Sequence, residues 1–454
     1  MQDIHFVEAI SPWLSPTDGP LRAHLALAIR QAIGTGHLPA GTRLPPERTL
    51  ARALHVSRPT ISAVVDDLRA SGLVDSRQGS GSWVTQGHTP SRPTVPFAEL
   101  LQPNGSIDLA AATAPDASHL PQMRVEIADL LGAEPSNGLT LLGIEPLRRE
   151  IARRNDLGLP KAPSLTADHV VVTSGAHQAL SLVVATCAPP GSSILVEETT
   201  YGGLIDMIHA NGCVPIGVPR DEEGPIPDQL ASRLATHRPA LTILVSCVHS
   251  PTGTVSSPDR TSALAEVLRD ASALVVLDET YADLEFTPTG RTLASQLGHD
   301  AIRVGSLSKT LWTGLRTGWI IAPPELCTSI GRQRWQQFDL GPAIPSQLFA
   351  LQAFDHFDEV VDTRRSQLSD KSRWLATALL EKFGDWSLSR VDGGLAVWAE
   401  LPVDGDDFAA RASMRGVAVL PGSAFRADSA PTPHIRICFD RPIDVLETAV
   451  DRLG

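Results

Sequence analysis

The chain has 454 residues and a formal net charge of −13, with 42% hydrophobic and 20% charged residues. This length exceeds one ordinary hydrophobic core, so we expect two or three domains, and the composition is that of a soluble globular protein. No apolar run approaches the roughly 18–20 residues of a membrane span, and the start, MQDIHFVEAI, lacks a signal pattern. We therefore expect a cytoplasmic protein with no membrane partner. The five cysteines are scattered and odd in number, which favours reduced thiols over disulfides or a metal site.

The charge is uneven along the chain. Residues 1–88 carry eight Arg or Lys against seven Asp or Glu, so the remaining residues carry 30 against 44. The acidic remainder is a poor surface for nucleic acid. The nearly neutral first part can bind DNA if its arginines gather on one face.

The first part has a helical pattern. Leu21–Ile33 repeats apolar residues at helical spacing, and a second short helix is expected at about Pro46–Leu54. Ser57 is a good N-cap for a third helix, Arg58–Ala70. Two short strands around a Gly-Ser-Gly tip follow in residues 72–85. Three helices and a hairpin describe a winged helix-turn-helix.

In such a unit the N-terminal end of the third helix enters the major groove of DNA. Here it presents Ser57, Arg58 and Thr60 to phosphates and base edges, while Arg48 of the second helix reaches the backbone. The alternative is an interaction module in which these arginines are merely solvated.

Residues 19–84 resemble the DNA-binding domain of the GntR family, through the segments TRLPPERTLA, VSRPT and SRQGSG. The resemblance implies a DNA-binding domain over residues 15–86 with double-stranded DNA as partner. The DNA-facing residues that it implies are Arg48, Ser57, Arg58, Pro59, Thr60 and Gly79. The family often has a polar residue in place of Pro59, which leaves the base preference there open. The proline-bearing stretch 87–107 is predicted to be a linker.

From residue 108 onward, apolar runs alternate with helical patterns. The expected strands include VVVTSG, SSILVEE, LTILVSCV, ALVVLDE and IRVGS. This alternation predicts an α/β fold for residues 108–454, with a mainly parallel sheet, helices on both faces and a small C-terminal α+β part. Ligands bind such sheets at the carboxyl ends of the strands.

One of these strands leads into the turn that carries Lys309. Apolar neighbours desolvate this amine and lower its pKa, as a lysine that forms a Schiff base requires. Ser306, Ser308 and Arg316 lie within a few residues of it. These groups suit a ligand that has an aldehyde and a phosphate, namely pyridoxal 5′-phosphate (PLP). The alternative is a surface turn with a solvated lysine.

Further polar residues follow other strands. Asp278 ends an apolar run, where a carboxylate needs a partner such as a protonated pyridine nitrogen, or else caps the next helix. Tyr281 can donate to the phenolic oxygen of the ring. Gly175 and Ala176 open a helix whose N–H groups can bind a phosphate. His177 comes next and either touches the ring or caps that helix.

Three more positions complete the predicted site. Tyr201 lies just past a strand, where it can stack on a flat ring. Ser250 begins the turn SPTG. Arg436 lies on a late strand and clamps a carboxylate if it is buried facing the cofactor, but it is an ordinary strand-edge charge if exposed.

Residues 108–450 resemble the fold-type I aminotransferases through GIEPLRREIA, TSGAHQAL, VEETTYGG, SPTGTV, LDETYADL, GSLSKTLWTGLRTGW and HIRICF. The resemblance implies PLP as cofactor, Lys309 as the catalytic residue bonded to it, and Asp278 and Tyr281 on its ring. The phosphate-binding residues that it implies are Gly175, Ala176, Ser306, Ser308 and Arg316, with Arg436 taking an effector's carboxylate. The family usually has Asn in place of Ser250 and a Tyr shortly before Gly143, and both departures would tolerate slow or absent turnover.

A GntR-type head tethered to an aminotransferase-like domain is the layout of the MocR regulators. This resemblance implies a homodimeric, PLP-dependent transcriptional regulator that senses PLP, an amine or an amino acid. The alternative is a working aminotransferase with a vestigial or tethering head.

Overall fold

The computed structural model describes residues 41–54, 56–70, 74–77, 81–84, 96–101, 106–114, 117–124, 138–156, 164–290 and 292–454, with isolated positions before residue 41 and between 126 and 132. The chain divides into two compact units. One is built on residues 1–95, and the other contains most of the chain from residue 96 onward.

The first unit is helical and ends in a β-hairpin. It contains α3 (Glu47–Ala53), α4 (Arg58–Ala70) and the antiparallel pair β1 (Val74–Arg77) and β2 (Gly81–Val84). Residues from an earlier helix pack into the same core, and these are Leu25, Ala28, Ile29, Ala32 and Ile33. The predicted helix-turn-helix with a following hairpin is confirmed. The tip of the hairpin lies outside the described residues.

The sequence of α4 explains how it sits in this unit. Ile61, Val64, Val65 and Leu68 repeat at three- and four-residue spacing, and all four are buried. The Ser57 hydroxyl accepts a hydrogen bond from the backbone N–H of Thr60, at 3.3 Å, and so caps the start of the helix. The N-terminal end of α4 is therefore held in place while its outer face stays in solvent.

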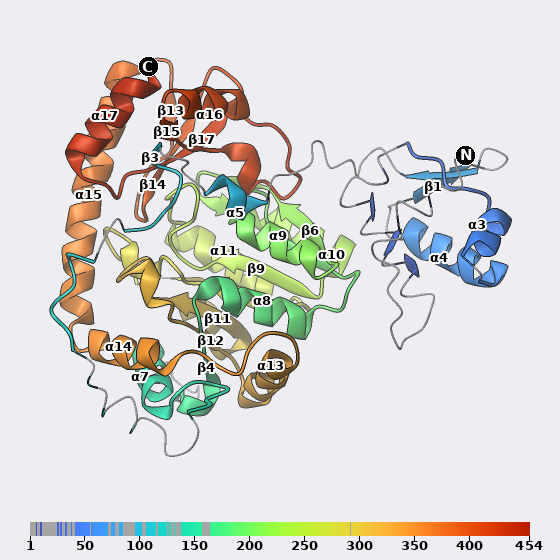
Figure 1. The fold of residues 1–454 in the computed structure, drawn as a ribbon, viewed down its shortest axis with the longest axis horizontal. Helices are drawn as coiled ribbons and strands as arrows, with labels where there is room; N and C mark the ends of the chain where they lie inside the picture. Colours follow the sequence, from blue (N-terminus) through green and yellow to red (C-terminus); the bar gives the residue numbers. More distant parts are fainter. Residues whose placement is uncertain are drawn as a thin grey trace. The chain divides into compact units, whose positions relative to one another are not determined.

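The larger unit is centred on a seven-stranded sheet (Figure 1). The strand order is β4 (Val170–Thr173), β12 (Gly318–Ile321), β11 (Ala301–Ser306), β10 (Leu274–Asp278), β9 (Leu241–Val245), β5 (Ser193–Glu197) and β6 (Val214–Val218). Strands β5, β9, β10 and β11 are parallel, whereas β12 is antiparallel to both of its neighbours. The predicted mainly parallel α/β sheet is confirmed, and β12 is a strand that the sequence analysis did not identify.

Helices cover this sheet (Figure 1). They are α7 (Glu145–Asn155), α8 (Ala176–Cys187), α9 (Gly202–Ala210), α10 (Pro227–His237), α11 (Pro258–Arg269), α12 (Leu293–Leu297), α13 (Pro324–Gln337) and α14 (Ile344–Phe354). One apolar core joins α10, α11 and α12 to the central strands through Leu230, Leu264 and Leu277. A second core joins α7 and α14 to the β4 edge through Leu147 and Val172.

The C-terminal part is a smaller α+β layer, as predicted. Its four-stranded sheet has the order β13 (Ser387–Leu388), β14 (Ala396–Glu400), β17 (His434–Cys438), β16 (Leu420–Pro421). The long helix α15 (Phe357–Lys382) runs beside α17 (Ile443–Leu453), and α16 (Gly405–Met414) lies near the sheet (Figure 1). Two short pieces from the beginning of the unit join this part: α5 (Phe97–Leu100) and β3 (Ile107–Asp108), which pairs in parallel with β15 (Val417–Ala418).

Residues 97–101 fall within the stretch predicted to be a linker, yet they belong to the larger unit. Phe97 is buried, and its ring packs edge-on against Tyr201 and Phe425 with centroids 5.4 Å away in both cases. The backbone N–H of Phe97 donates to Asp206 on α9, at 2.7 Å. A single buried aromatic thus ties α5 to the body of the unit.

Within the described residues, no helix combines the length and the apolar character needed to cross a lipid bilayer.

Candidate functional site

The larger unit encloses a cavity of about 350 Å³ near the carboxyl ends of β10 and β11. Every residue predicted to contact PLP or an effector lines this cavity: Gly175, Ala176, His177, Tyr201, Ser250, Asp278, Tyr281, Ser306, Ser308, Lys309, Arg316 and Arg436. Its wall also contains residues that were not predicted from the sequence, among them Phe97, Leu101, Ala111, Ala112 and Thr113. Residues at the carboxyl ends of β4, β5, β9, β10 and β11 therefore converge on one space, together with Arg316 before β12 and Arg436 on β17.

Lys309 follows β11 and points into the cavity. Its Nζ atom donates to the backbone carbonyl of Ala112 at 2.7 Å and lies 5.7 Å from the centroid of the Tyr281 ring. Burial, followed by the nearby charge of Arg436, lowers the pKa of Lys309 to about 8. A useful fraction of the amine is therefore neutral near pH 7, and the neutral form is the nucleophile.

Asp278 ends β10, a strand that lies between β9 and β11 in the middle of the sheet. Burial raises the pKa of this carboxyl above its ordinary value, because it outweighs the opposing effects of the hydrogen bonds from Thr280 and of the charge of Lys309. Its Oδ1 atom accepts the Thr280 backbone N–H at 2.9 Å. A buried carboxylate gains most from a cation beside it, and a protonated ring nitrogen is such a cation.

Tyr281 and Ser250 lie on the same side of the cavity. Burial raises the pKa of Tyr281, and a hydrogen bond with Ser250 acts in the opposite direction. The tyrosine therefore stays protonated, and its O–H group can donate a hydrogen bond to an acceptor in the cavity.

An anion cradle forms at the start of α8. Gly175 is the N-cap, with φ +114° and ψ 168°, a backbone conformation used almost solely by glycine. A Cβ atom here would lie 3.3 Å from the Arg316 guanidinium. The Ser306 and Ser308 hydroxyls lie 2.9 Å apart, and both side chains are buried. Backbone N–H groups, two hydroxyls and a guanidinium form a donor set that suits a phosphate.

Tyr201 forms a wall of the cavity. Its hydroxyl lies 3.2 Å from Nδ1 of His177, and the two rings meet edge-on. Burial raises the pKa of Tyr201 to about 12, and burial followed by the charge of Arg316 lowers the pKa of His177. Both rings are held in their uncharged forms, in an orientation that a flat ligand can pack against.

Arg436 lies on β17, between β14 and β16, and its side chain is 3% exposed. The Nη2 atom donates to the backbone carbonyl of Ala110 at 2.5 Å, and the guanidinium carbon lies 4.7 Å from the Phe425 ring centroid. Its Nε atom is buried and has no hydrogen-bond partner in the part of the chain that the structure describes. Arg436 is thus a buried cation on the cavity wall and not a charge on the edge of the sheet.

A buried polar network that was not predicted from the sequence lies behind the turn that carries Ser250. The His249 Nδ1 atom lies 2.8 Å from the Thr252 hydroxyl, which lies 2.8 Å from the Thr254 hydroxyl. Arg220 donates to Thr254 at 3.2 Å and lies 3.4 Å from Glu197. His249, Thr252 and Thr254 are close together in the sequence, but Glu197 and Arg220 come from other strands, so no local motif links these two to the turn.

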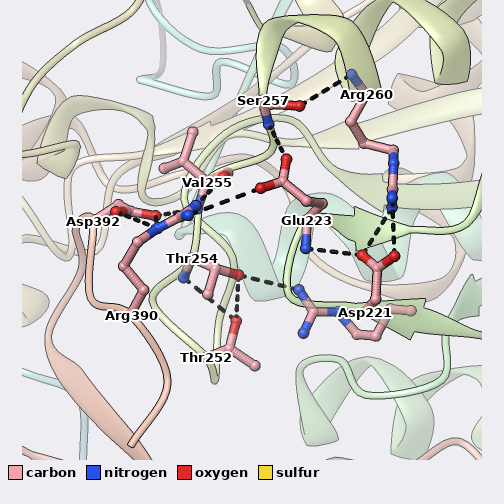
Figure 2. A network of polar contacts seen from close by, with 10 residues as sticks. Asp221, Glu223, Thr252, Thr254, Val255, Ser257, Arg260, Arg390 and Asp392 are labelled. Carbon is pink, nitrogen blue, oxygen red and sulfur yellow. Dashed lines mark hydrogen bonds and ion pairs between the residues drawn. The ribbon is translucent and has the colours of Figure 1, made fainter.

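The outer part of this network fastens the turn to the C-terminal layer (Figure 2). The Asp392 carboxylate accepts a hydrogen bond from the Val255 backbone N–H at 3.0 Å. The Nε atom of Arg390 donates to both carboxylate oxygens of Asp392, at 2.8 and 2.7 Å. The Asp392 N–H in turn donates to the carbonyl of Gly253 at 2.9 Å. Figure 2 also shows Glu223 accepting the N–H of Ser257 at the start of α11. Ser250 therefore sits on a turn that is held from both sides.

The smaller unit carries the residues predicted to face DNA. Arg48, Ser57, Arg58 and Pro59 are exposed, and Thr60 is half-buried. The Arg58 side chain is 70% exposed, and its Nε atom lies 3.7 Å from a Glu47 carboxylate oxygen. Gly79 lies outside the described residues.

The cavity fits PLP in its chemistry. Lys309 would bond to the aldehyde, Asp278 would pair with the ring nitrogen, and the cradle at Gly175 would hold the phosphate. Because Gly175 has no side chain, the space beside the Arg316 guanidinium, where a Cβ atom would lie 3.3 Å away, stays open for a phosphate. When bound, PLP supplies an aldehyde that accepts amines and a ring that draws electrons from them.

Comparisons with known proteins agree with this architecture. Residues 107–453 match the family of class I and II aminotransferases, and residues 21–84 match the gntR family of bacterial regulatory proteins. YdfD of Bacillus subtilis, an uncharacterized HTH-type transcriptional regulator, is 26% identical over 82% of this chain and 83% of its own. PtsJ of Salmonella typhimurium, a vitamin B6 salvage pathway transcriptional repressor, is 28% identical over 92% of this chain and 94% of its own.

A solved structure has the fold of the larger unit. LysN, the alpha-aminoadipate aminotransferase of Thermus thermophilus, was determined with N-(5′-phosphopyridoxyl)-L-leucine. It is 26% identical with a TM-score of 0.69, and the match covers 80% of this chain and 94% of LysN.

Proposed function

We propose that this chain, which belongs to the class I and II aminotransferase family and carries a gntR-type head, binds double-stranded DNA and senses PLP, an amine or an amino acid at Lys309. The two domains together have the MocR-type layout of a PLP-dependent transcriptional regulator. The single observation that carries the sensing part is the cavity: an amine with a pKa of about 8 lies in one space with a buried carboxylate and an anion cradle.

In the head, we assign the DNA contacts to the N-terminal end of α4 and to the start of α3. Arg58 and Arg48 supply charge for phosphates and guanine edges, and Ser57 and Thr60 supply short hydroxyl donors. Arg58 is available because its interaction with Glu47 is long and open to solvent. Gly79, which lies outside the described residues, stays a predicted DNA contact on the basis of the GntR resemblance.

In the larger unit, we assign the roles residue by residue. Lys309 holds PLP, Asp278 and Tyr281 hold its ring, and Tyr201 with His177 flanks it. Arg436 receives the carboxylate of an amino acid, which would also give a partner to its buried Nε atom. PtsJ is described as a repressor of vitamin B6 salvage, so PLP itself is one effector to test.

We further propose a homodimer that presents two heads to paired half-sites. Large apolar side chains lie exposed around the end of α13, and Leu139, Trp335, Phe338 and Leu340 are each at least 41% exposed. The segment before α7 packs here, because the buried Arg334 donates to the carbonyl of Leu141 at 2.7 Å. A second copy that covers this surface would remove these side chains from water, and a two-fold dimer matches a two-fold operator.

The test is a DNA-binding titration. The affinity of the full-length protein for duplexes from the region upstream of its own gene is measured by fluorescence anisotropy, with PLP absent or present and then with a panel of amines and amino acids. The proposal expects at least one addition to change the affinity, and expects Lys309→Ala to remove the visible absorption of bound PLP and the response together. Unchanged DNA affinity under every addition would refute effector control.

A second candidate function is aminotransferase activity, because the same cavity is lined by Lys309, Asp278 and the anion cradle, which are groups that PLP chemistry uses. Steady production of a 2-oxo acid from an amino donor, with a second 2-oxo acid as acceptor, would favour this function. Ser250→Asn restores the residue that aminotransferases usually have at this turn. An increase in turnover in this variant would show that Ser250 limits the reaction.

A further inference from the structure

A short stretch of backbone contacts the two cations that a ligand must engage. We call residues 108–113 the strap. Its Ala112 carbonyl accepts the Nζ hydrogen bond of Lys309 at 2.7 Å, and its Ala110 carbonyl accepts the Nη2 hydrogen bond of Arg436 at 2.5 Å. The strap therefore accepts hydrogen bonds from Lys309, which in the proposed function binds the cofactor, and from Arg436, which binds a carboxylate.

Arg441 fixes the strap from behind. Its Nε atom donates to the carbonyl of Asp108 at 2.8 Å, and its Nη1 atom donates to that of Thr113 at 2.7 Å. Its Nη2 atom donates to the Ala111 carbonyl at 3.2 Å and to the Asp108 carboxylate at 3.1 Å. One nearly buried guanidinium thus spans the strap from its first residue to its last.

Asp108 fixes the strap from within. Its Oδ1 atom accepts the backbone N–H groups of Ala110 and Ala111, each at 2.9 Å. These two bonds set the turn that directs the Ala110 carbonyl toward Arg436. Leu109 anchors the start of the strap in the core, and beyond it the strap carries only alanines and Thr113. The course of the strap past Leu109 is therefore set by the hydrogen bonds to Asp108 and Arg441.

We propose that the strap is an autoinhibitory contact, and that Arg441 is the positioning residue that sets its strength. This inference rests on the proposed function. An incoming carboxylate competes with the Ala110 carbonyl for Arg436, and any group that bonds to Lys309 replaces its hydrogen bond to Ala112. Because a carboxylate forms a stronger, charge-assisted bond to Arg436 than a carbonyl does, an amino acid can displace the strap where a simple amine displaces it less completely.

The strap also has a position in the chain that suits a regulator. It continues from β3, whose pairing with β15 includes hydrogen bonds from Ile107 and Leu109 to the carbonyls of Gly416 and Ala418, each at 2.9 Å. In the sequence it follows α5 and the stretch that joins the two units. In the sequence, the strap therefore adjoins the segments that lead to the DNA-binding head.

The experiment compares two ligands that differ by one carboxylate. L-Leucine and 3-methylbutylamine, which is leucine without its carboxylate, are titrated into the PLP-loaded full-length protein, and the shift of the PLP absorption gives each affinity. In Arg441→Gln, we expect the affinity for L-leucine to rise about tenfold, the value of one hydrogen bond to a charged group. The affinity for the amine should change less than about twofold. Loss of the Arg441 charge would by itself weaken carboxylate binding, so the expected rise is opposite to a simple electrostatic effect.

Two further variants make the result specific. Arg415→Gln is the charge-matched control, since it removes an exposed arginine whose Nη1 atom donates to the Leu453 carbonyl at the end of α17. It should leave both affinities unchanged. Asp108→Asn weakens the strap while keeping the Arg441 charge, and it should favour L-leucine in the same direction. It replaces Arg441→Gln if that variant does not fold.

Hydrogen–deuterium exchange of the PLP-free protein is measured beside these titrations. In the PLP-free protein, the Ala110 and Ala111 amides should exchange with deuterium faster in Arg441→Gln and Asp108→Asn than in wild type or Arg415→Gln. Equal gains for both ligands, or no gain for L-leucine, would overturn the strap as a competitor while leaving amine sensing intact. If neither ligand shifts the absorption of any variant, amine sensing itself fails and the strap inference fails with it.

Discussion

His249 Nε2 lies 3.1 Å from Glu197 Oε2, and both side chains are at most 4% exposed. Burial, followed by the charge of Arg220, lowers the pKa of His249 well below its ordinary value, whereas burial raises the pKa of Glu197. The folded protein therefore keeps the imidazole neutral. A neutral ring can accept a hydrogen bond from the Thr252 hydroxyl at Nδ1 and donate one from Nε2 to the Thr199 carbonyl.

The lowered pKa of His249 predicts how the free energy of unfolding depends on pH. Because the folded-state pKa of His249 is lowered, only the unfolded chain binds this proton below the unfolded pKa of about 6.5. The contribution of His249 to the free energy of unfolding is thus complete above that pH and decreases as the pH falls, by up to about 1.4 kcal/mol per pH unit. His249→Gln should flatten the decline in urea-unfolding free energy between pH 7 and pH 5.5. His356→Gln, at an exposed N-cap, is the control, and an unchanged slope in His249→Gln would contradict the assignment.

Lys309 predicts a second pH dependence, in the rate of PLP capture. With a pKa of about 8, roughly a tenth of the amine is neutral at pH 7, against about one part in a few thousand for an ordinary lysine. The rate of PLP capture by the PLP-free protein should rise about tenfold from pH 7 and level off above pH 8 to 9. Stopped-flow absorbance measures it. A rate that keeps rising to pH 10 would show that the cavity does not lower this pKa.

The sequence predicted the convergence of the site because parallel strands place their carboxyl ends at one edge of a sheet. Asp278 and Lys309 follow β10 and β11, which are neighbours in the sheet, and Gly175 follows β4, two strands farther along. These residues were identifiable since each combines a polar or glycine residue with the end of an apolar run. Their common cavity follows from the topology.

Other features depend on tertiary contacts and left no local signal. The strap contacts Lys309 and Arg436 through the backbone carbonyls of Ala112 and Ala110. Every residue has such a carbonyl, so the alanine side chains do not mark these positions in the sequence. Phe97 is one aromatic among prolines, so its stretch is typical of a linker until packing against Tyr201 and Phe425 is known. The Glu197–His249 pair joins positions about fifty residues apart.

Arg58 predicts a salt-dependent defect in DNA binding. Arg58→Ala removes a charge at the N-terminal end of α4, so affinity for duplex DNA should fall, and the slope of log affinity against log salt should become smaller by about one. Fluorescence anisotropy at several salt concentrations measures both. Arg69→Ala removes the same charge near the other end of α4, where Arg69 pairs with Asp66 at 2.7 Å, and it serves as the control. Equal effects of the two variants would mean that overall charge, and not the end of the helix, governs binding.

Gly175 predicts a defect in PLP binding. Gly175→Ala forces an alanine into a backbone region that only glycine adopts readily, at about 1–3 kcal/mol, and places its Cβ atom 3.3 Å from the Arg316 guanidinium. Both effects disturb the anion cradle, so the Kd for PLP should rise about tenfold or more. Gly290→Ala is the matched control, because Gly290 also has a positive φ but an added Cβ there meets nothing within 4 Å. Fluorescence titration with PLP compares the two variants, with urea unfolding of the PLP-free proteins to separate strain from ligand loss. If Gly290→Ala weakens PLP binding as much as Gly175→Ala, the loss reflects general destabilisation, and the phosphate does not sit at the start of α8.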